Sequence, residues 1–358
     1  ARMAVVGIYD CLETGEYYGQ YIMPFFGSDD MFMVRGVGAD GTRRDLSHYM
    51  YTSSNTWIAS VWKFAYQGLD RANLAIASIE QMEGYEGNTA LQELVGQAKF
   101  LRAFLAFDLV RFFGDVPFSV DYTSGYEQTS KPRMDRELIY DQIIDDLNFA
   151  KEHLYVGSAV ASSEIPCKGA ARALLMRVYL QRAGYSLSST TGKLTRPDDT
   201  TRKSYFEAVI REWETFKAEG YHNFYGGGYE QLFKNYSQLI LNNQESLWEI
   251  AFEPNQGQTD NAGMWATYNG PIVDAPGSYS GTSSYMGRAN AFFTVLPYWK
   301  SFYESNADEI TREKCRAREN YMCLERKLAE QEAALSEKDN TLAEKDNVIA
   351  ERDNALAE

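Results

Sequence analysis

One segment decides the fold: Gln97-Ala-Lys-Phe-Leu-Arg-Ala-Phe-Leu-Ala-Phe-Asp-Leu-Val-Arg-Phe-Phe-Gly-Asp-Val-Pro-Phe118. Apolar residues recur in it at three- and four-residue steps, and the stripe extends back to Leu91. This spacing places the side chains on one face of a helix, which we expect over Thr89–Phe113. Four phenylalanines widen the apolar face, so the helix should be buried on more than one side: Phe100, Phe104, Phe107 and Phe112. Gly114 is expected to cap this helix, and Pro117 prevents its continuation.

The surrounding sequence predicts four further helices and one strand. Helical spacing begins at Trp57 and covers about residues 57–76, 136–154, 167–183 and 202–219, with Asp135 as the N-cap of the second of these. Alternating large apolar residues predict a strand over 246–252. Helices joined by short or moderate loops are typical of stacked tetratricopeptide-type hairpins, although no clean signature of roughly 34 residues repeats. The predicted fold class is mainly α, with helical repeats over about residues 57–220.

Charge and composition exclude several classes of protein. The chain has 358 residues, with 35 Lys and Arg against 50 Asp and Glu, which gives a net charge of −15. Because phosphate binding depends mainly on Lys and Arg, we expect no general affinity for nucleic acid, and anionic lipid surfaces are a poor match too. No stretch approaches the roughly 18 apolar residues of a membrane-spanning helix. The aromatic content of 14% exceeds what the core needs, so some rings should serve as surface contacts.

Little in the sequence points to catalysis, a cofactor or a metal. The common nucleotide-binding, nucleophile-elbow and zinc-protease motifs are absent. Four cysteines and three histidines are scattered along the chain, so no metal site is predicted. The acidic pair Asp29–Asp30 lies in a loop, but adjacency in sequence does not place two carboxylates across a sugar. Three charged residues inside the apolar helix are expected to form buried structural ion pairs: Arg102, Asp108 and Arg111.

The segment 253–287 differs in character from the rest of the chain. It is rich in Gly, Asn, Ser, Thr and Pro, and it holds four aromatic residues: Trp265, Tyr268, Tyr279 and Tyr285. A loop this long inside a compact protein is usually functional or disordered. Two interpretations of its rings stay open. In the first, the rings stack on the C–H faces of sugars, and nearby polar groups form hydrogen bonds with the sugar hydroxyls. In the second, the rings fix the loop onto the helices.

The quoted segment Gln97–Phe118 strongly resembles the signature helix of the SusD/RagB family, the outer-membrane glycan-binding lipoproteins of Bacteroidetes. Further matches follow the family's order along the chain: Trp62–Asn73, Arg136–Leu147, Gly169–Leu180, Glu219–Tyr221 and Glu245–Ile250. Together they cover about residues 5–305, so the resemblance is specific.

The resemblance implies a right-handed set of tetratricopeptide-like helix pairs with a loop-rich ligand-binding part, here residues 20–56 and 253–297. It implies a protein that is not an enzyme and needs no cofactor. Such a protein captures oligo- or polysaccharide at the cell surface and delivers it to a SusC-like TonB-dependent transporter of the outer membrane. Family ligand contacts correspond here to the segments 28–55 and 253–288, whose candidate ligand-binding residues are Asp30, Arg35, Tyr51, Asn55, Trp265, Tyr268 and Tyr279.

Residues 306–358 depart from the family and are predicted to form a charged helical tail. Apolar residues recur there every seven positions: Leu328, Leu335, Leu342, Ile349 and Leu356. A coiled coil needs two apolar positions per heptad, and the second is here at best an alanine. A solvated charged helix and a weak oligomerising coiled coil both stay open. We therefore expect a C-terminally truncated SusD-like domain over 1–305, followed by a tail foreign to the family.

Two functions from different classes remain open at this point. The lipidated N-terminal cysteine of the family is absent from this chain, so a membrane anchor is expected from the resemblance alone. The alternative to glycan capture is a helical-repeat protein-interaction module that assembles through the heptad tail. Glycan binding lost on replacing loop aromatics would favour the first function, and oligomerisation that depends on residues 321–358 would favour the second.

Overall fold

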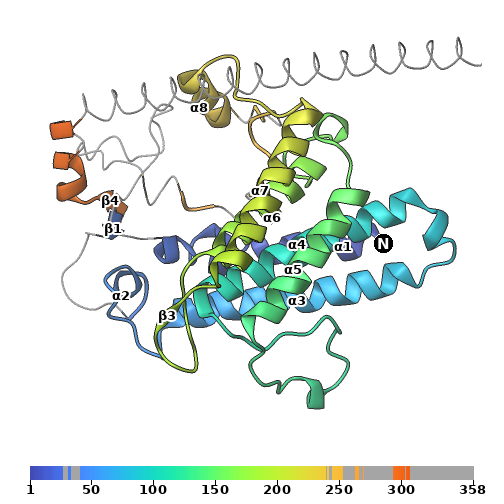
Figure 1. Cartoon of the computed structure of the whole chain (residues 1–358), viewed down its shortest axis with the longest axis horizontal. Helices are drawn as coiled ribbons and strands as arrows, with labels where there is room; N and C mark the ends of the chain where they lie inside the picture. Colours follow the sequence, from blue (N-terminus) through green and yellow to red (C-terminus); the bar gives the residue numbers. More distant parts are fainter. Residues whose placement is uncertain are drawn as a thin grey trace, which may run out of the picture. The chain divides into compact units, whose positions relative to one another are not determined.

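The computed structural model describes residues 1–26, 31–33, 41–238, 240–241, 244–252, 263–265, 269, 293–302 and 304–306 (Figure 1). The labelled α-helices are α1 (Arg2–Leu12), α2 (Arg43–Ser47), α3 (Thr56–Glu80), α4 (Thr89–Phe113), α5 (Arg136–His153), α6 (Lys168–Ala183), α7 (Asp199–Glu219) and α8 (Tyr229–Ser237). Short strands pair as β1 (Met31–Met33) with β4 (Phe293–Val295), and as β2 (Ser186–Leu187) with β3 (Leu194–Thr195). The chain divides into two compact units, Ala1–Thr294 and Val295–Glu358.

Short polar side chains set the starts of the four long helices α3, α4, α5 and α7. Each accepts hydrogen bonds from backbone N–H groups of the first turn, which otherwise have no partner: Asn55, Asn88, Asp135 and Asp198. Helix α4 ends at Gly114, whose φ of 72° is open to glycine but strained for other residues. The five predicted helices and the caps at Asp135 and Gly114 are therefore confirmed.

Helix α4 is the centre of the first unit. It packs against α3 on one side and α5 on another, and Figure 1 shows the three helices side by side. This explains why its apolar residues surround the helix rather than forming one stripe. Between α3 and α4 the contact is close, because a Cβ added at Gly68 would lie 2.7 Å from a methyl carbon of Leu105. The remaining helices continue the stack, with α5 packed on α6 and α6 on α7.

Charged residues inside this core are paired, as the sequence predicts. Arg102 donates to both carboxylate oxygens of Asp146 at 2.7 Å, and its third nitrogen donates to Asn73 at 2.9 Å. Arg111 pairs with Asp108 at 2.7 Å. The same Asp108 carboxylate accepts the hydroxyl groups of two tyrosines that precede the loop-rich part: Tyr17 and Tyr18. These networks join α4 to α3, to α5 and to the N-terminal segment.

The prediction that helical spacing begins at Trp57 is wrong, because the chain already forms a helix near residue 1. Helix α1 lies there and packs on α3, with Arg71 donating to the Gly7 carbonyl oxygen and to Asp10, both at 2.6 Å. Its Tyr9 hydroxyl donates to Gln97 on α4 at 2.9 Å. Short sequence patterns without a capping side chain give little helical signal, and α1 has no such cap.

The strand predicted over 246–252 is also wrong. This segment belongs to none of the described sheets, and it packs against the helices. The Trp248 indole contacts Phe100 and Phe104 of α4 edge-on, and the Glu249 N–H donates to the Ser163 carbonyl oxygen at 2.8 Å. The alternating large apolar residues of 246–252 therefore reflect packing of this segment on a helical surface. Such packing gives the same two-residue period as a half-buried strand.

The predicted heptad tail lies outside the described residues, apart from Asn306, and the division of domains at residue 305 stays a prediction. Among the residues that the structure does describe, no helix is both long and apolar enough to cross a bilayer.

Candidate functional site

Three of the seven predicted ligand-binding residues are described: Tyr51, Asn55 and Trp265. The other four, which are Asp30, Arg35, Tyr268 and Tyr279, lie outside the described residues. Ligand binding by these seven residues therefore stays a prediction. The surroundings of Tyr51, Asn55 and Trp265 are described below.

Asn55 is buried, and its whole amide is engaged in the fold. The side-chain oxygen accepts from the backbone N–H groups of Trp57 and Ile58 at 3.0 and 3.2 Å. The side-chain nitrogen donates to the Thr42 carbonyl oxygen at 2.8 Å. One residue thus caps α3 and holds the segment that leads into α2.

Trp265 is partly buried and anchors its segment on the helical unit. Its indole nitrogen donates to the Tyr18 carbonyl oxygen at 2.6 Å, and its ring lies 5.9 Å from that of Phe26. The backbone N–H of the preceding Met264 donates to the Gly19 carbonyl oxygen at 2.8 Å. For this ring, the contacts fit the interpretation that it fixes the loop onto the helices.

Tyr51 is one of two exposed tyrosines that follow α2. Tyr49, Met50 and Tyr51 are 74%, 64% and 51% exposed. Tyr49 has a φ of 57°, and it is the one non-glycine residue of the described chain with positive φ. Such strained backbone persists where the surrounding structure fixes it, and it occurs often at ligand sites. Here the Tyr49 and Met50 N–H groups bind carbonyl oxygens of α2 at 3.1 and 2.8 Å. Sequence reasoning missed Tyr49, although the spacing Tyr-Met-Tyr was visible.

An aromatic pair of the buried Trp57 and the partly buried Tyr21 supports this exposed segment. The rings of Tyr21 and Trp57 stack at 4.1 Å with an angle of 5° between their planes. Trp57 is buried in a small cluster with Met23, Leu46 and Phe293, and Leu46 belongs to α2. The backbone beneath Tyr49 and Tyr51 is thus fixed by packing. Exposed rings on a fixed backbone suit the stacking of a flat apolar surface.

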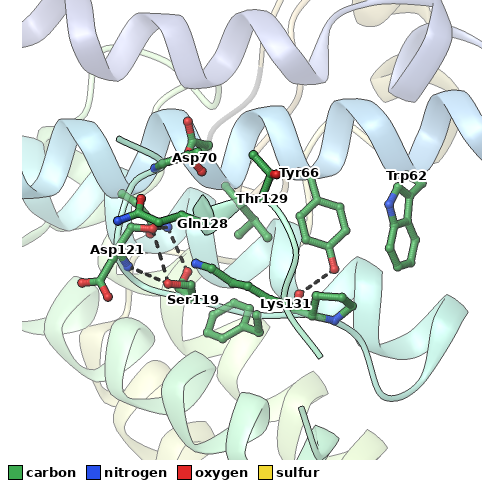
Figure 2. Close-up of a pocket in the computed structure, with 13 residues that line it drawn as sticks. Trp62, Tyr66, Asp70, Ser119, Asp121, Gln128, Thr129 and Lys131 are labelled. Atoms are coloured by element: carbon green, nitrogen blue, oxygen red, sulfur yellow. Dashed lines mark hydrogen bonds between the residues drawn. The ribbon is translucent and has the colours of Figure 1, made fainter. Parts of the chain in front are cut away.

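A second feature, which the sequence analysis did not identify, is a pocket of about 420 Å³ between α3 and the segment 117–131. We call it the α3 pocket. Figure 2 shows Trp62 and Tyr66 at one end, and Asp70, Ser119, Asp121 and Gln128 together at the other. The Lys131 side chain extends across the pocket between the two ends.

Hydrogen bonds fix the polar end of the α3 pocket. Asn73 of α3 donates to the carbonyl oxygens of Ser119 and Asp121 at 2.9 and 3.2 Å. Asp70, one turn earlier, accepts from the Thr123 N–H at 2.7 Å. Within the described chain, neither the Asp121 carboxylate nor the Lys131 ammonium group makes a hydrogen bond or an ion pair. Both charged groups therefore have unused bonding capacity, and Figure 2 shows the Asp121 carboxylate directed away from Tyr66 and Lys131.

The aromatic end is fixed by one hydrogen bond and by ring contacts. Burial raises the pKa of Tyr66, so its hydroxyl stays protonated and donates to the Pro117 carbonyl oxygen at 2.6 Å. The Trp62 ring lies 4.8 Å from that of Tyr66 and meets Phe113 edge-on at 5.0 Å. Trp62 and Tyr66 stand one turn apart on α3, and Asp70 and Asn73 follow at the same helical spacing. This spacing was visible in the sequence, but the sequence did not indicate that residues 117–131 face it.

Comparison with known proteins gives a consistent result. Residues 24–180 match the model of the SusD-like family, described as starch-binding and associating with the outer membrane. SusD-like protein P2 of Formosa agariphila is 29% identical over 188 residues, which are 51% of this chain and 36% of that protein. A SusD-like protein of Bacteroides ovatus is 24% identical over 268 residues, 70% of this chain and 46% of that protein. The chain thus spans less than half the length of these curated relatives.

Solved structures share the fold. A SusD homolog from Bacteroides thetaiotaomicron superposes with a TM-score of 0.72 at 23% identity, over 87% of this chain and 56% of that one. A structure with xylogluco-oligosaccharide gives 0.59 at 21% identity, over 82% and 52% of the two chains. A laminarin-binding SusD-like protein gives 0.60 at 20% identity, over 85% and 63%. The predicted mainly helical, tetratricopeptide-like fold is confirmed.

Proposed function

We propose that this chain is a SusD-like protein, which the match over residues 24–180 supports, and that it binds oligo- or polysaccharide without chemically changing it. Family membership supports the class of ligand, and relatives of the same fold bind xylogluco-oligosaccharide and laminarin. The family description also supports a place at the outer membrane. Delivery of the glycan to a SusC-like TonB-dependent transporter, and attachment through a lipid anchor, are parts of the same proposal.

The observation that carries the proposal is the exposed tyrosine segment beside α2. Tyr49 and Tyr51 lie within the residues matched by the family model and within the loop-rich part, on backbone fixed by α2 and by the Tyr21–Trp57 stack. Tyrosine combines an apolar face for the C–H side of a sugar ring with a hydroxyl that exchanges hydrogen bonds with sugar hydroxyls. Of the other predicted residues, Asp30 and Arg35 would supply polar contacts.

Affinity electrophoresis in gels that contain laminarin, xyloglucan or starch tests this proposal. We expect at least one polysaccharide to retard the wild type, and Tyr51→Ala to weaken that binding about tenfold. A tenfold change corresponds to about 1.4 kcal/mol, which is the scale of an aromatic contact that dominates a binding site. Tyr155→Ala is the matched control, because Tyr155 is 46% exposed and lies outside the loop-rich part. Release of reducing ends would contradict the proposed absence of catalysis, and no retardation of folded protein by any polysaccharide would contradict binding.

A further inference from the structure

We propose that the α3 pocket is a second saccharide-binding site, separate from the loop-rich part, and that it takes a neutral sugar rather than an acidic one. The proposal concerns a different surface from Tyr49 and Tyr51, and it does not require that surface to bind. Three properties of the pocket carry it: its two unlike ends, its charge and its fixed walls.

The two ends match the two kinds of surface on a pyranose ring. Trp62 and Tyr66 present aromatic carbon at one end, which suits the C–H face of a sugar. At the other end, the exposed Asp121 offers carboxylate oxygens that accept from hydroxyls at the edge of the pocket, and the exposed Gln128 adds an amide. Lys131 adds an ammonium donor between them. A volume of about 420 Å³ lies within the range of roughly 300–1,000 Å³ typical of small-molecule sites.

The charge of the pocket selects against acidic sugars. Asp70 and Asp121 contribute two negative charges, and Lys131 contributes one positive charge. A uronate or sulfate group would gain one ion pair with Lys131, but it would also lie near the carboxylates of Asp70 and Asp121. Like charges so close disfavour binding, and the net charge of −15 on the whole chain acts in the same direction.

The walls of the pocket are already in place before a ligand binds. The Asn73 amide and the Asp70 carboxylate tie the facing segment to α3 at three backbone positions. The Gln128 side chain accepts from the Ser124 N–H at 2.8 Å, which closes the segment on itself. Binding then needs little ordering of loops, so a modest number of contacts gives measurable affinity.

Isothermal titration with neutral and acidic oligosaccharides tests the proposal. The probes are maltoheptaose, laminariheptaose, a xyloglucan heptasaccharide and an oligogalacturonate. The variants are Asp121→Ala, Lys131→Ala and their combination, each made in wild type and in Tyr51→Ala. These two side chains have no partner within the described chain, so their removal leaves the fold intact. Asp145→Ala and Lys193→Ala, exposed residues elsewhere on the unit, are the controls.

In the Tyr51→Ala background we expect residual binding of a neutral probe, weakened at least fivefold by the double variant and unchanged by the controls. We expect oligogalacturonate to bind at least tenfold more weakly than that neutral probe. Hydrogen exchange should slow in residues 119–131 when the neutral probe is present. Trp62→Phe, which keeps a ring at this position, should retain binding.

The outcomes separate the two proposals. Binding lost in Tyr51→Ala alone, with no effect of the double variant, overturns the second site and leaves the loop-rich site standing. Binding lost in the double variant alone confirms the α3 pocket and overturns the tyrosine site. Equal or tighter binding of oligogalacturonate at the pocket overturns the neutral-sugar assignment, and a wild type that binds no probe overturns both proposals.

Discussion

The Asn55 side chain joins α3 to the segment that precedes α2. Its contribution to stability can be measured against that of Asn88, a second asparagine cap in the same protein. It caps α3 and also binds the Thr42 carbonyl oxygen, whereas Asn88 makes the same two capping bonds at α4 but is exposed and has no third bond. We predict that Asn88→Ala costs about 1 kcal/mol of unfolding free energy and Asn55→Ala about 2 kcal/mol. Urea denaturation monitored by circular dichroism measures both. Equal losses would show that the bond to Thr42 contributes nothing.

At the same scale, burial controls the chemistry of the two described cysteines. Burial raises the pKa of Cys11 to about 11, although the nearby Arg71 opposes the shift, and burial likewise raises the pKa of Cys167. The thiolate is the reactive form, so at pH 8 nearly all of each thiol is protonated and shielded. We predict that iodoacetamide leaves both residues unmodified in native protein and modifies both in urea, with the Cys11 rate rising as pH approaches 11. Peptide mapping by mass spectrometry reads each site separately, and rapid native labelling at pH 8 would contradict this.

At the scale of elements, the crossing of α3 and α4 depends on a missing side chain. Glycine inside a helix costs about 1 kcal/mol relative to alanine. At Gly7 of α1 an added Cβ meets nothing within 4 Å, so Gly7→Ala should stabilise the protein by about 0.5–1 kcal/mol. At Gly68 the same carbon would collide with the fully buried Leu105, so Gly68→Ala should destabilise it by about 1–3 kcal/mol despite the gain in helix propensity. Thermal unfolding of the Gly7→Ala and Gly68→Ala variants tests this prediction. If both changes stabilise the protein, α3 and α4 can move apart at little cost.

Elements also show how far sequence reasoning reaches. Long helices with capping side chains were predicted closely, because a periodic stripe and a cap at Asp135 or a glycine at 114 are independent signals that agree. Helix α1 and the extended segment at Trp248 were not predicted, because each is stabilised by residues far away in sequence. The α3 pocket was missed for the same reason. Its helical half has a visible spacing, but nothing in residues 117–131 indicates which helix they face.

At the scale of the whole molecule, stability should reside in the helical unit. Every buried residue of its main core lies between Val5 and Val178. We predict that a variant ending at Asn306 keeps the midpoint of thermal unfolding within about 2 °C, because a change of 1 kcal/mol shifts that midpoint by roughly 2–4 °C in a domain of this size. Light scattering on the same variant tests the alternative function. Loss of an oligomer together with residues 307–358 would favour assembly through the heptad tail.

The position of α1 has a consequence for how the chain folds during synthesis. Its partners lie 64 positions later at Arg71 and 88 positions later at Gln97. At roughly 5–20 residues per second, a delay of about 88 residues amounts to roughly 4–18 s. For that time the apolar face formed by Val5, Ile8 and Leu12 has left the ribosome without the helices that later bury it. Helix α1 is therefore a segment of the nascent chain that a chaperone would meet unprotected.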